Sequence, residues 1–346
     1  MIRLSLPVLL FILTITPHAS LAQGYDFQTG MEAYENGDHA TALENFLEGA
    51  RVGHALAQYN LAVMYHQGIG TEPDLERAMQ LYGLSAQQGV VPAQYELGRI
   101  HDNGDGVPQD YREAYYWYEQ AAEQGDAEAQ YAVGTMNFYG QGRPEEPAEA
   151  IEWYRLAAEQ GHGDAQYNLG VMHINGLGTA TDQEKALEWF ERSAGNGSVD
   201  GSYNAGLMHI SGQSTPEDPV RAREYFEKAA RSGLREAQAQ LGMLYASGNG
   251  VERDFGTARE WFLEAAEQGD PVSQAFLAQI YREGLGVEAD VVTAHMWYDL
   301  AYRHGHRRML RHMNNLQGTM TAEQLREARD RVVAWMEQRD TRPTTN

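Results

Sequence analysis

The chain has 346 residues, with 49 acidic and 26 basic side chains and a formal net charge of −23 at pH 7. A surface of that sign repels phosphate backbones and anionic lipid headgroups, which argues against nucleic acid as a partner and against electrostatic attachment to a membrane. The absence of cysteine excludes disulfides, thiol nucleophiles and thiolate metal sites.

Residues 1–22 have the pattern of a secretory signal peptide. Arg3 gives a short positive start, and a mostly apolar run follows it. Ser20 and Ala22 then place small side chains at the −3 and −1 positions of a cleavage site before Gln23. The apolar run is too short for a comfortable membrane-spanning helix. We therefore expect a periplasmic or secreted chain with no stable membrane insertion after cleavage; a retained N-terminal anchor is the alternative.

Residues 23–53 predict a capping helix pair in front of a repeat array. Phe27, Met31 and Tyr34 are spaced for one face of a first helix, and Phe46 belongs to the apolar face of a second. Repeat arrays need atypical units at their ends, because an ordinary repeat would leave an apolar face open to water.

A pattern of 36 residues then recurs seven times without a gap. A fixed period of this length, two helices long, is typical of an α-helical solenoid, in which each unit buries its apolar face against its neighbours. We therefore expect one elongated array rather than several globular domains. Each block is numbered from position 1 to position 36, and the blocks are residues 54–89, 90–125, 126–161, 162–197, 198–233, 234–269 and 270–305.

Each block predicts two helices. Positions 4, 8 and 11 are small or aliphatic and fall on one stripe of a first helix. In the second helix, position 28 is mostly tryptophan and position 29 is always aromatic, and we expect these side chains to pack in the core. Glycines at positions 15 and 36 and an acid at position 21 are expected to end and begin these helices. Position 9 is glycine in five blocks. Glycine inside a helix costs about 1 kcal/mol relative to alanine, so we expect the partner helix to approach closely there.

The period is lost after the last block, and residues 306–346 predict capping helices and a tail. Thr321 and Gln324 have the spacing of a capping box at the start of a helix. The apolar stripe of that helix is expected to cover the open face of the last repeat. This stripe consists of Leu325, Ala328, Val332, Trp335 and Met336.

The skeleton of the blocks resembles a known family. Residues 126–161 read DAEAQYAVGTMNFYGQGRPEEPAEAIEWYRLAAEQG, and residues 234–269 follow the same pattern of A-Q, G-x-G, A-x-x-W and A-A-E-x-G. This pattern resembles the Sel1-like repeat family, relatives of tetratricopeptide repeats. The resemblance implies an all-α fold, a right-handed superhelical solenoid of antiparallel helix pairs. It also implies an adaptor or regulator, since members include exported bacterial proteins that modulate signalling, envelope assembly or host contact.

No residue pattern points to catalysis or to a bound metal. The chain has no G-x-S-x-G, S-x-x-K or H-E-x-x-H motif. A calcium loop at residues 102–106 fails because His101 and Arg112 fall on its two end ligand positions. The histidines of residues 304–312 lie beside arginines, which disfavours a bound cation, and the histidines that recur at position 12 are expected to form a half-buried row. We predict no catalytic residue, no metal site and no cofactor.

One further stripe on the first helices, at positions 6, 10 and 13, is a candidate binding surface. It is apolar in the third to fifth blocks and becomes polar towards both ends of the array. First helices are expected to line the concave side of such a solenoid, where anchors for a peptide belong. The alternative is that the stripe packs against the first helix of the next repeat. This central strip consists of Tyr131, Thr135, Phe138, Tyr167, Val171, Ile174, Tyr203, Leu207 and Ile210.

The sequence thus predicts a binding protein rather than an enzyme. We expect an exported interaction scaffold or regulatory protein of the bacterial envelope, which binds another protein or a peptide segment on its concave face. Two alternatives remain. An envelope hydrolase acting on peptide-like or β-lactam substrates requires carboxylates on that face that titrate abnormally, although the chain lacks the cysteines of the β-lactam-linked relatives. A glycan-binding module requires Tyr131, Tyr167 and Tyr203 to be exposed rather than stacked.

Overall fold

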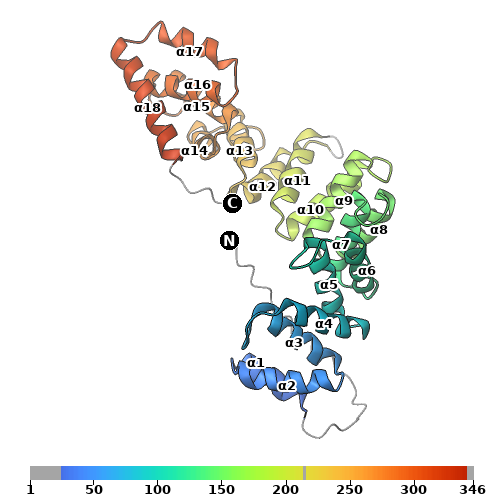
Figure 1. Ribbon diagram of the computed structural model, residues 1–346. Coiled ribbons are helices and arrows are strands. Elements are labelled where there is room, and N and C mark those ends of the chain that lie inside the picture. The colour runs from blue at the N-terminus through green and yellow to red at the C-terminus, as the bar shows by residue number, and fades with distance from the viewer. Residues whose placement is uncertain (1–24, 213–215, 341–346) are drawn as a thin grey trace. The chain divides into compact units, whose positions relative to one another are not determined.

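The computed structural model describes residues 25–212 and 216–340, which form eighteen helices and no strand (Figure 1). The predicted signal peptide lies outside these residues. Among the described helices, none combines the length and the apolar character that crossing a bilayer requires. The described chain is therefore all-α, as the repeat pattern predicts.

The residues group into two compact units, divided between Asp110 and Tyr111, within the second block. One continuous array was the expectation. In a repeat protein each helix contacts only its neighbours, so a division can fall between any two helices. Consecutive helices pack against each other within the first unit. Its helices are α1 (Phe27–Glu35), α2 (His39–Arg51), α3 (Ala55–Gln67), α4 (Leu75–Gln87) and α5 (Val91–Asn103).

The second unit contains the candidate binding surface and the C-terminal cap. From α6 to α17 each helix packs against the next, and α18 packs against α16. Its helices are α6 (Tyr111–Glu123), α7 (Ala127–Tyr139), α8 (Pro147–Glu159), α9 (Gly163–Asn175), α10 (Gln183–Gly195), α11 (Val199–Ser211), α12 (Pro219–Arg231), α13 (Arg235–Ser247), α14 (Phe255–Glu267), α15 (Pro271–Glu283), α16 (Val291–Arg303), α17 (Met309–Gln317) and α18 (Ala322–Asp340).

The predicted core stripes are buried. In α7, Ala129, Val133 and Met136 occupy positions 4, 8 and 11 and are at most 2% exposed. The aromatic side chains at position 29 are buried in every block. The tryptophans at position 28 agree with the expectation in two blocks, where Trp189 and Trp297 are buried, and differ in three, where the side chains are only half-buried: Trp117, Trp153 and Trp261.

Position 9 is glycine because an aromatic ring occupies the space of its side chain. A Cβ atom built on Gly242 would lie 2.5 Å from Cδ1 and Cε1 of Phe262, which is fully buried at position 29 of the same block. Gly170 and Gly206 would place a Cβ atom 2.6 Å from the equivalent rings. Such distances are far below van der Waals contact, so the close approach inferred from the sequence is confirmed.

Five of the predicted acids cap the helices that follow them, namely Asp74, Asp182, Asp218, Asp254 and Asp290. The carboxylate of Asp182, at position 21, accepts a hydrogen bond from the backbone N–H of Lys185 at 3.0 Å. Glu146 occupies the same position before α8 but makes no capping bond with its side chain. Its longer side chain suits a cap less well, and Pro147 directly after it has no N–H to satisfy.

Buried glutamines at position 5 tie successive second helices together, a feature that the sequence analysis did not single out. Gln166 of α9 is 1% exposed. Its Nε2 donates to the carbonyl oxygen of Ala158 in α8 at 2.9 Å, and its Oε1 accepts from Nδ2 of Asn196, just after α10, at 2.8 Å. Each glutamine therefore joins the end of one repeat to the end of the next.

Helices outside the repeats lie at both ends of the described chain. Thr321 and Gln324 exchange the two hydrogen bonds of a capping box, and Ala328 and Val332 of α18 are buried, but Met336 of the predicted stripe is exposed. At the other end, Gly30 and Ala33 are the buried residues of α1, and its predicted face is half-buried. A Cβ atom on Gly30 would lie 2.8 Å from Cε1 of Phe46, so α2 packs directly on the backbone of α1 at this point.

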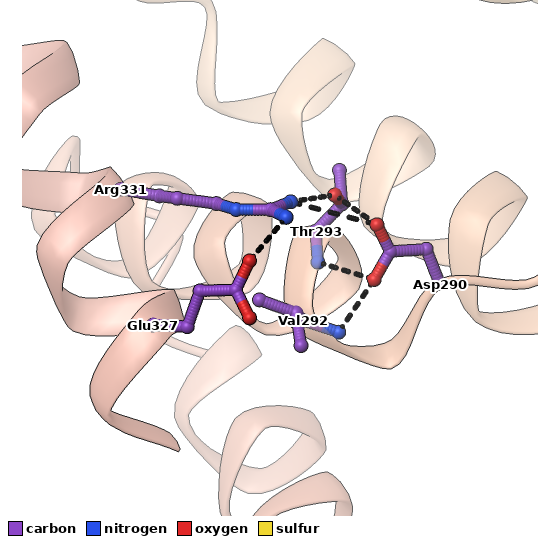
Figure 2. A network of polar contacts seen from close by, with 5 residues as sticks. All are labelled: Asp290, Val292, Thr293, Glu327 and Arg331. Atoms are coloured by element: carbon purple, nitrogen blue, oxygen red, sulfur yellow. Dashed lines mark hydrogen bonds and ion pairs between the residues drawn. The ribbon is translucent and has the colours of Figure 1, made fainter. Parts of the chain in front are cut away.

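A polar network fastens α18 to the start of α16. Figure 2 shows Arg331 of α18 reaching over the N-cap Asp290. Nη1 of Arg331 donates to Oγ1 of Thr293 at 2.6 Å and lies 3.5 Å from Oδ2 of Asp290, while Nη2 donates to Oε1 of Glu327 at 2.6 Å (Figure 2). Asp290 also accepts from the backbone N–H groups of Val292 and Thr293. One carboxylate thus caps α16 and anchors the terminal helix.

This network predicts an acid-sensitive contribution to stability. Burial alone would raise the pKa of Asp290, but hydrogen bonds from Thr293 and Val292 and the charge of Arg331 hold that pKa below its usual value. A lowered pKa contributes stability above the unfolded value of about 3.9 and loses it as the pH falls through the folded value. We expect Asp290→Asn to melt below wild type at pH 7 and the gap in Tm to narrow below pH of about 4. A gap that stays constant down to pH of about 3 would show that ionisation of Asp290 contributes nothing.

Candidate partner-binding face

The nine residues of the central strip lie on three first helices of the second unit, α7, α9 and α11, and all nine are half-buried. The recurrence of one position every 36 residues brings equivalent side chains onto equivalent faces. The strip is therefore neither sealed core nor fully exposed surface.

Neighbouring repeats cover the inner part of the strip. Tyr167, Val171 and Ile174 of α9 pack against a buried cluster that contains Ala205 and Met208 of α11. The trio of α11 packs in the same way against a cluster that contains Leu241 and Leu244 of α13. Repeat stacking thus accounts for the buried part of these side chains, and a smaller outer part stays open to solvent.

The tyrosines of the strip rest on buried rings. The ring centres of Tyr167 and Phe190 are 5.7 Å apart, and those of Tyr203 and Phe226 are 5.8 Å apart. Tyr131 is stacked on His162, with ring centres 4.4 Å apart. The glycan alternative requires exposed, unstacked tyrosines, and this arrangement does not provide them.

Each tyrosine hydroxyl lies beside an acid and an amide of the next first helix. Burial raises the pKa of Tyr131, the negative charge of Asp164 adds to the rise, and hydrogen bonds with Thr135 and Asn168 oppose it. The phenol therefore stays protonated at neutral pH. The corresponding sets are Tyr167 with Asp200 and Asn204, and Tyr203 with Glu236 and Gln240.

A row of exposed carboxylates accompanies the strip. Glu128, Asp164 and Asp200 stand in the first turns of α7, α9 and α11, where the positive end of the helix dipole favours an acid. Oε2 of Glu128 lies 3.4 Å from Nε2 of His162. Asp164 and Asp200 form no ion pair within the described part of the chain. The face therefore combines partly exposed apolar side chains with the negative charges of Asp164 and Asp200, which no ion pair among the described residues neutralises.

The carboxylates with raised pKa values do not form a catalytic pair on this face. Burial raises the pKa of Asp126, but its Oδ1 accepts from the N–H of Ala129 at 2.8 Å and caps α7. A hydrogen bond with Glu146 raises the pKa of Glu149. Glu146 and Glu149 both pair with Arg143. They lie at the start of α8, which is a second helix and not part of this face. The arrangement required for the hydrolase alternative is not found among the described first helices.

The histidines play structural roles. The half-buried row predicted at position 12 is wrong in the second unit, where His173 and His209 are 8% and 2% exposed. His209 is buried because its ring stacks on Tyr225 at 5.6 Å and its Nε2 lies 2.8 Å from Oε1 of Glu191. Across residues 25–212 and 216–340, no three His, Asp or Glu side chains converge in a way that could hold a metal ion.

Sequence reasoning found the strip but missed its polar border. The acids recur at position 3 and the amides at position 7, so the repeat register contained the signal. Their connection to the tyrosine of the preceding block only becomes visible once neighbouring first helices are seen side by side.

Comparisons with known proteins identify the repeat. A family model described as Sel1 repeat matches residues 55–90, 91–126, 127–162, 163–198, 199–234, 235–270 and 271–306, one residue later than the blocks defined above. A curated relative, an exopolysaccharide production negative regulator of Rhizobium leguminosarum bv. viciae, is 39% identical over 64 residues, which are 18% of this chain and 24% of that protein. The match therefore spans about a quarter of the relative's length.

Two solved structures are similar over most of their length. The protective antigen c5321 of uropathogenic Escherichia coli, which has the SLR fold, is 26% identical with a TM-score of 0.61, over 92% of this chain and 87% of that one. A Sel1 repeat protein of Oxalobacter formigenes is 29% identical with a TM-score of 0.62, over 84% and 86%. Since the family model matches far more than half of its residues, this chain belongs to the Sel1 repeat family.

Proposed function

We propose that the chain is an exported protein–protein interaction scaffold or regulatory binding protein of the bacterial envelope, and that the central strip holds its partner. Sel1 repeats are typical of interaction scaffolds and generally non-catalytic, and the curated relative is named as a regulator. The observation that carries the proposal is the partly exposed apolar strip over three successive repeats, bordered by Asp164 and Asp200, which form no ion pair in the described part of the chain. Residues 23–53 and 306–346 would close the two ends of the array.

The chemistry of this face selects a basic and apolar partner segment. Apolar side chains of the segment would cover the exposed part of the strip, and arginine or lysine side chains would meet Asp164 and Asp200. Charge complementarity of this kind steers association and determines specificity. An acidic segment would meet repulsion from the same row and from the net charge of −23.

The experiment compares two fluorescent peptides of equal length, one alternating leucine with arginine and the other leucine with glutamate. We expect anisotropy to report binding of the arginine peptide alone. The double variant Asp164→Asn, Asp200→Asn should weaken that binding about fivefold at low salt, since exposed charge pairs contribute up to about 1 kcal/mol. Chain purified from the periplasm should begin at Gln23, so mass spectrometry of the same sample tests export.

The matched control neutralises two acids of a second helix. Glu184 and Glu188 of α10 are exposed, and Glu184→Gln, Glu188→Gln changes the net charge by the same amount. Binding should survive in this variant. Equal losses in both double variants would mean that the peptide responds only to overall charge, and the assignment to the strip would be wrong.

A further inference from the structure

A cleft of about 380 Å³ opens between α12, α13 and α14 in the second unit, and no residue of the central strip lines it. Its wall contains two half-buried aromatic side chains, Tyr245 and Trp261. The charged residues of the lining are three glutamates and one arginine. The volume falls within the range of small-ligand sites, which begins at about 300 Å³.

Other repeats of this chain show what the aromatic side chain at position 28 attracts. The guanidinium carbon of Arg192 lies 4.3 Å from the ring centre of Trp189. Nζ of Lys228 lies 5.0 Å from the ring centre of Tyr225. In both blocks the cation stands three residues after the ring, on the same helix face, and is held by the negative face of the π system. These two blocks supply their own cation.

The block that contains Trp261 supplies an acid instead. Glu264 stands three residues after Trp261, and Glu260 directly precedes it. Both carboxylates are exposed and line the cleft. Oε2 of Glu264 has a long contact of 3.5 Å with Nε2 of Gln238, and Glu260 has no ion pair in the described part of the chain. The indole is thus surrounded by negative charge where its counterparts have a positive one.

The remaining polar groups of the cleft are already engaged. Glu227 pairs with Arg223 and lies 3.4 Å from Nη2 of Arg231. A hydrogen bond connects Tyr245 to Arg223. Glu227 and its two arginines together carry a net charge of +1. With Glu260 and Glu264 included, the group has a net charge of −1, and that excess comes from these two carboxylates.

We propose that this cleft binds an arginine side chain of a partner protein, in a second site that lies beyond the function proposed for the central strip. A guanidinium is planar, stacks on an indole and donates two hydrogen bonds side by side to carboxylates. It would take the place that Arg192 occupies over Trp189, with Glu260 and Glu264 as its counter-ions. An ammonium group is a strongly hydrated point charge and fits this combination less well.

The test follows the indole N–H resonances of the full chain by NMR, with Trp261 assigned through Trp261→Phe. The probe is N-acetyl-arginine methylamide, whose only charge is its guanidinium. The control probe is the citrulline analogue, which has nearly the same shape and no charge. We expect a saturable shift of Trp261 with the arginine probe, no shift with the citrulline probe, and an unmoved Trp153, which occupies position 28 of another block.

Two variants locate the site. Glu264→Arg reproduces the spacing of Trp189 and Arg192 and should abolish the shift without lowering Tm, because the internal cation then occupies the ring. Glu260→Gln should weaken binding about fivefold, as expected for the loss of one exposed counter-ion. Glu188→Gln, at the equivalent position beside Trp189, should have no effect.

Several outcomes would overturn the proposal. These are an arginine titration that Glu264→Arg leaves unchanged, equal shifts with the citrulline probe, or shifts of all indoles together. If a lysine probe binds as tightly as the arginine probe, the cleft is a general cation site, and the assignment to a guanidinium is wrong. The double variant Asp164→Asn, Asp200→Asn should not affect the Trp261 shift, so the proposal for this cleft is tested independently of the proposal for the central strip.

Discussion

Replacing Gly242 with alanine should destabilise the chain, although the same change inside a helix usually stabilises it by about 1 kcal/mol. The new Cβ atom would lie 2.5 Å from the ring of Phe262. Phe262 is fully buried and stacks face to face on Phe276, with ring centres 4.9 Å apart and planes within 3°, so it has no free direction in which to move. Overpacking of this kind costs about 1–3 kcal/mol.

Thermal unfolding of the full chain measures this effect, with a fall in Tm of about 2–4 °C for each kcal/mol. Gly195→Ala is the matched control in the same unit, because a Cβ atom at the end of α10 meets nothing within 4 Å. The control should melt at or slightly above the wild-type temperature. If Gly242→Ala raises Tm as much as Gly195→Ala does, the ring does not fix the glycine, and packing at position 9 is looser than described.

The helix pattern was predictable because its signals are local. Each helix from α3 to α16 has 13 residues, since glycines and capping acids recur at fixed positions of the repeat. Local signals also have local exceptions. Glu146 follows the acidic pattern and still makes no capping bond, because one additional methylene changes the reach of the carboxylate.

The candidate site was predictable only in part, because burial between repeats depends on how far apart neighbouring helices lie. The sequence places Tyr167, Val171 and Ile174 on one face, but it does not say how much of each side chain the next first helix covers. In the structure most of each side chain is covered and a smaller part stays exposed. Position in the repeat also does not distinguish the surroundings of Trp261 from those of Trp189. The difference lies three residues later, where Trp189 is followed by an arginine and Trp261 by a glutamate.

Replacing Gln166 with leucine should loosen the connection between successive repeats by about 2 kcal/mol, because two hydrogen bonds at about 1 kcal/mol each are lost. Leucine is similar in size, so little of the effect comes from a cavity. The carbonyl oxygen of Ala158 keeps its bond from the N–H of Gly161 at 3.0 Å, and Asn196 is exposed enough to bind water. The fall in stability therefore measures the two lost hydrogen bonds between the repeats rather than the cost of leaving buried polar groups without a partner.

The buried glutamine keeps a hydrogen-bonding partner at position 35 even where that partner is not glutamine, which supports a specific role. Gln130 pairs with Gln160 at 2.8 Å, and Gln274 pairs with His304 at 2.9 Å. In the fifth block both positions are serine, Ser202 and Ser232, and each hydroxyl bonds a backbone carbonyl of its own helix or turn instead. The bond between the two positions is therefore absent where serine replaces the glutamine.

The fifth block also supplies the control for Gln166→Leu. Ser202→Ala removes a buried hydroxyl at the same position, but one that bonds only the carbonyl of Ser198 at 2.8 Å, so its effect on Tm should be small. For Gln166→Leu we expect Tm to fall by about 4–8 °C, at about 2–4 °C for each kcal/mol. Amide hydrogen exchange should accelerate at the ends of α8 and α10, the two elements that Gln166 joins, and stay unchanged in α16. Equal effects of the two substitutions would show that the glutamine fills space without coupling the repeats, because both variants remove a buried polar group and only one removes a bond between blocks.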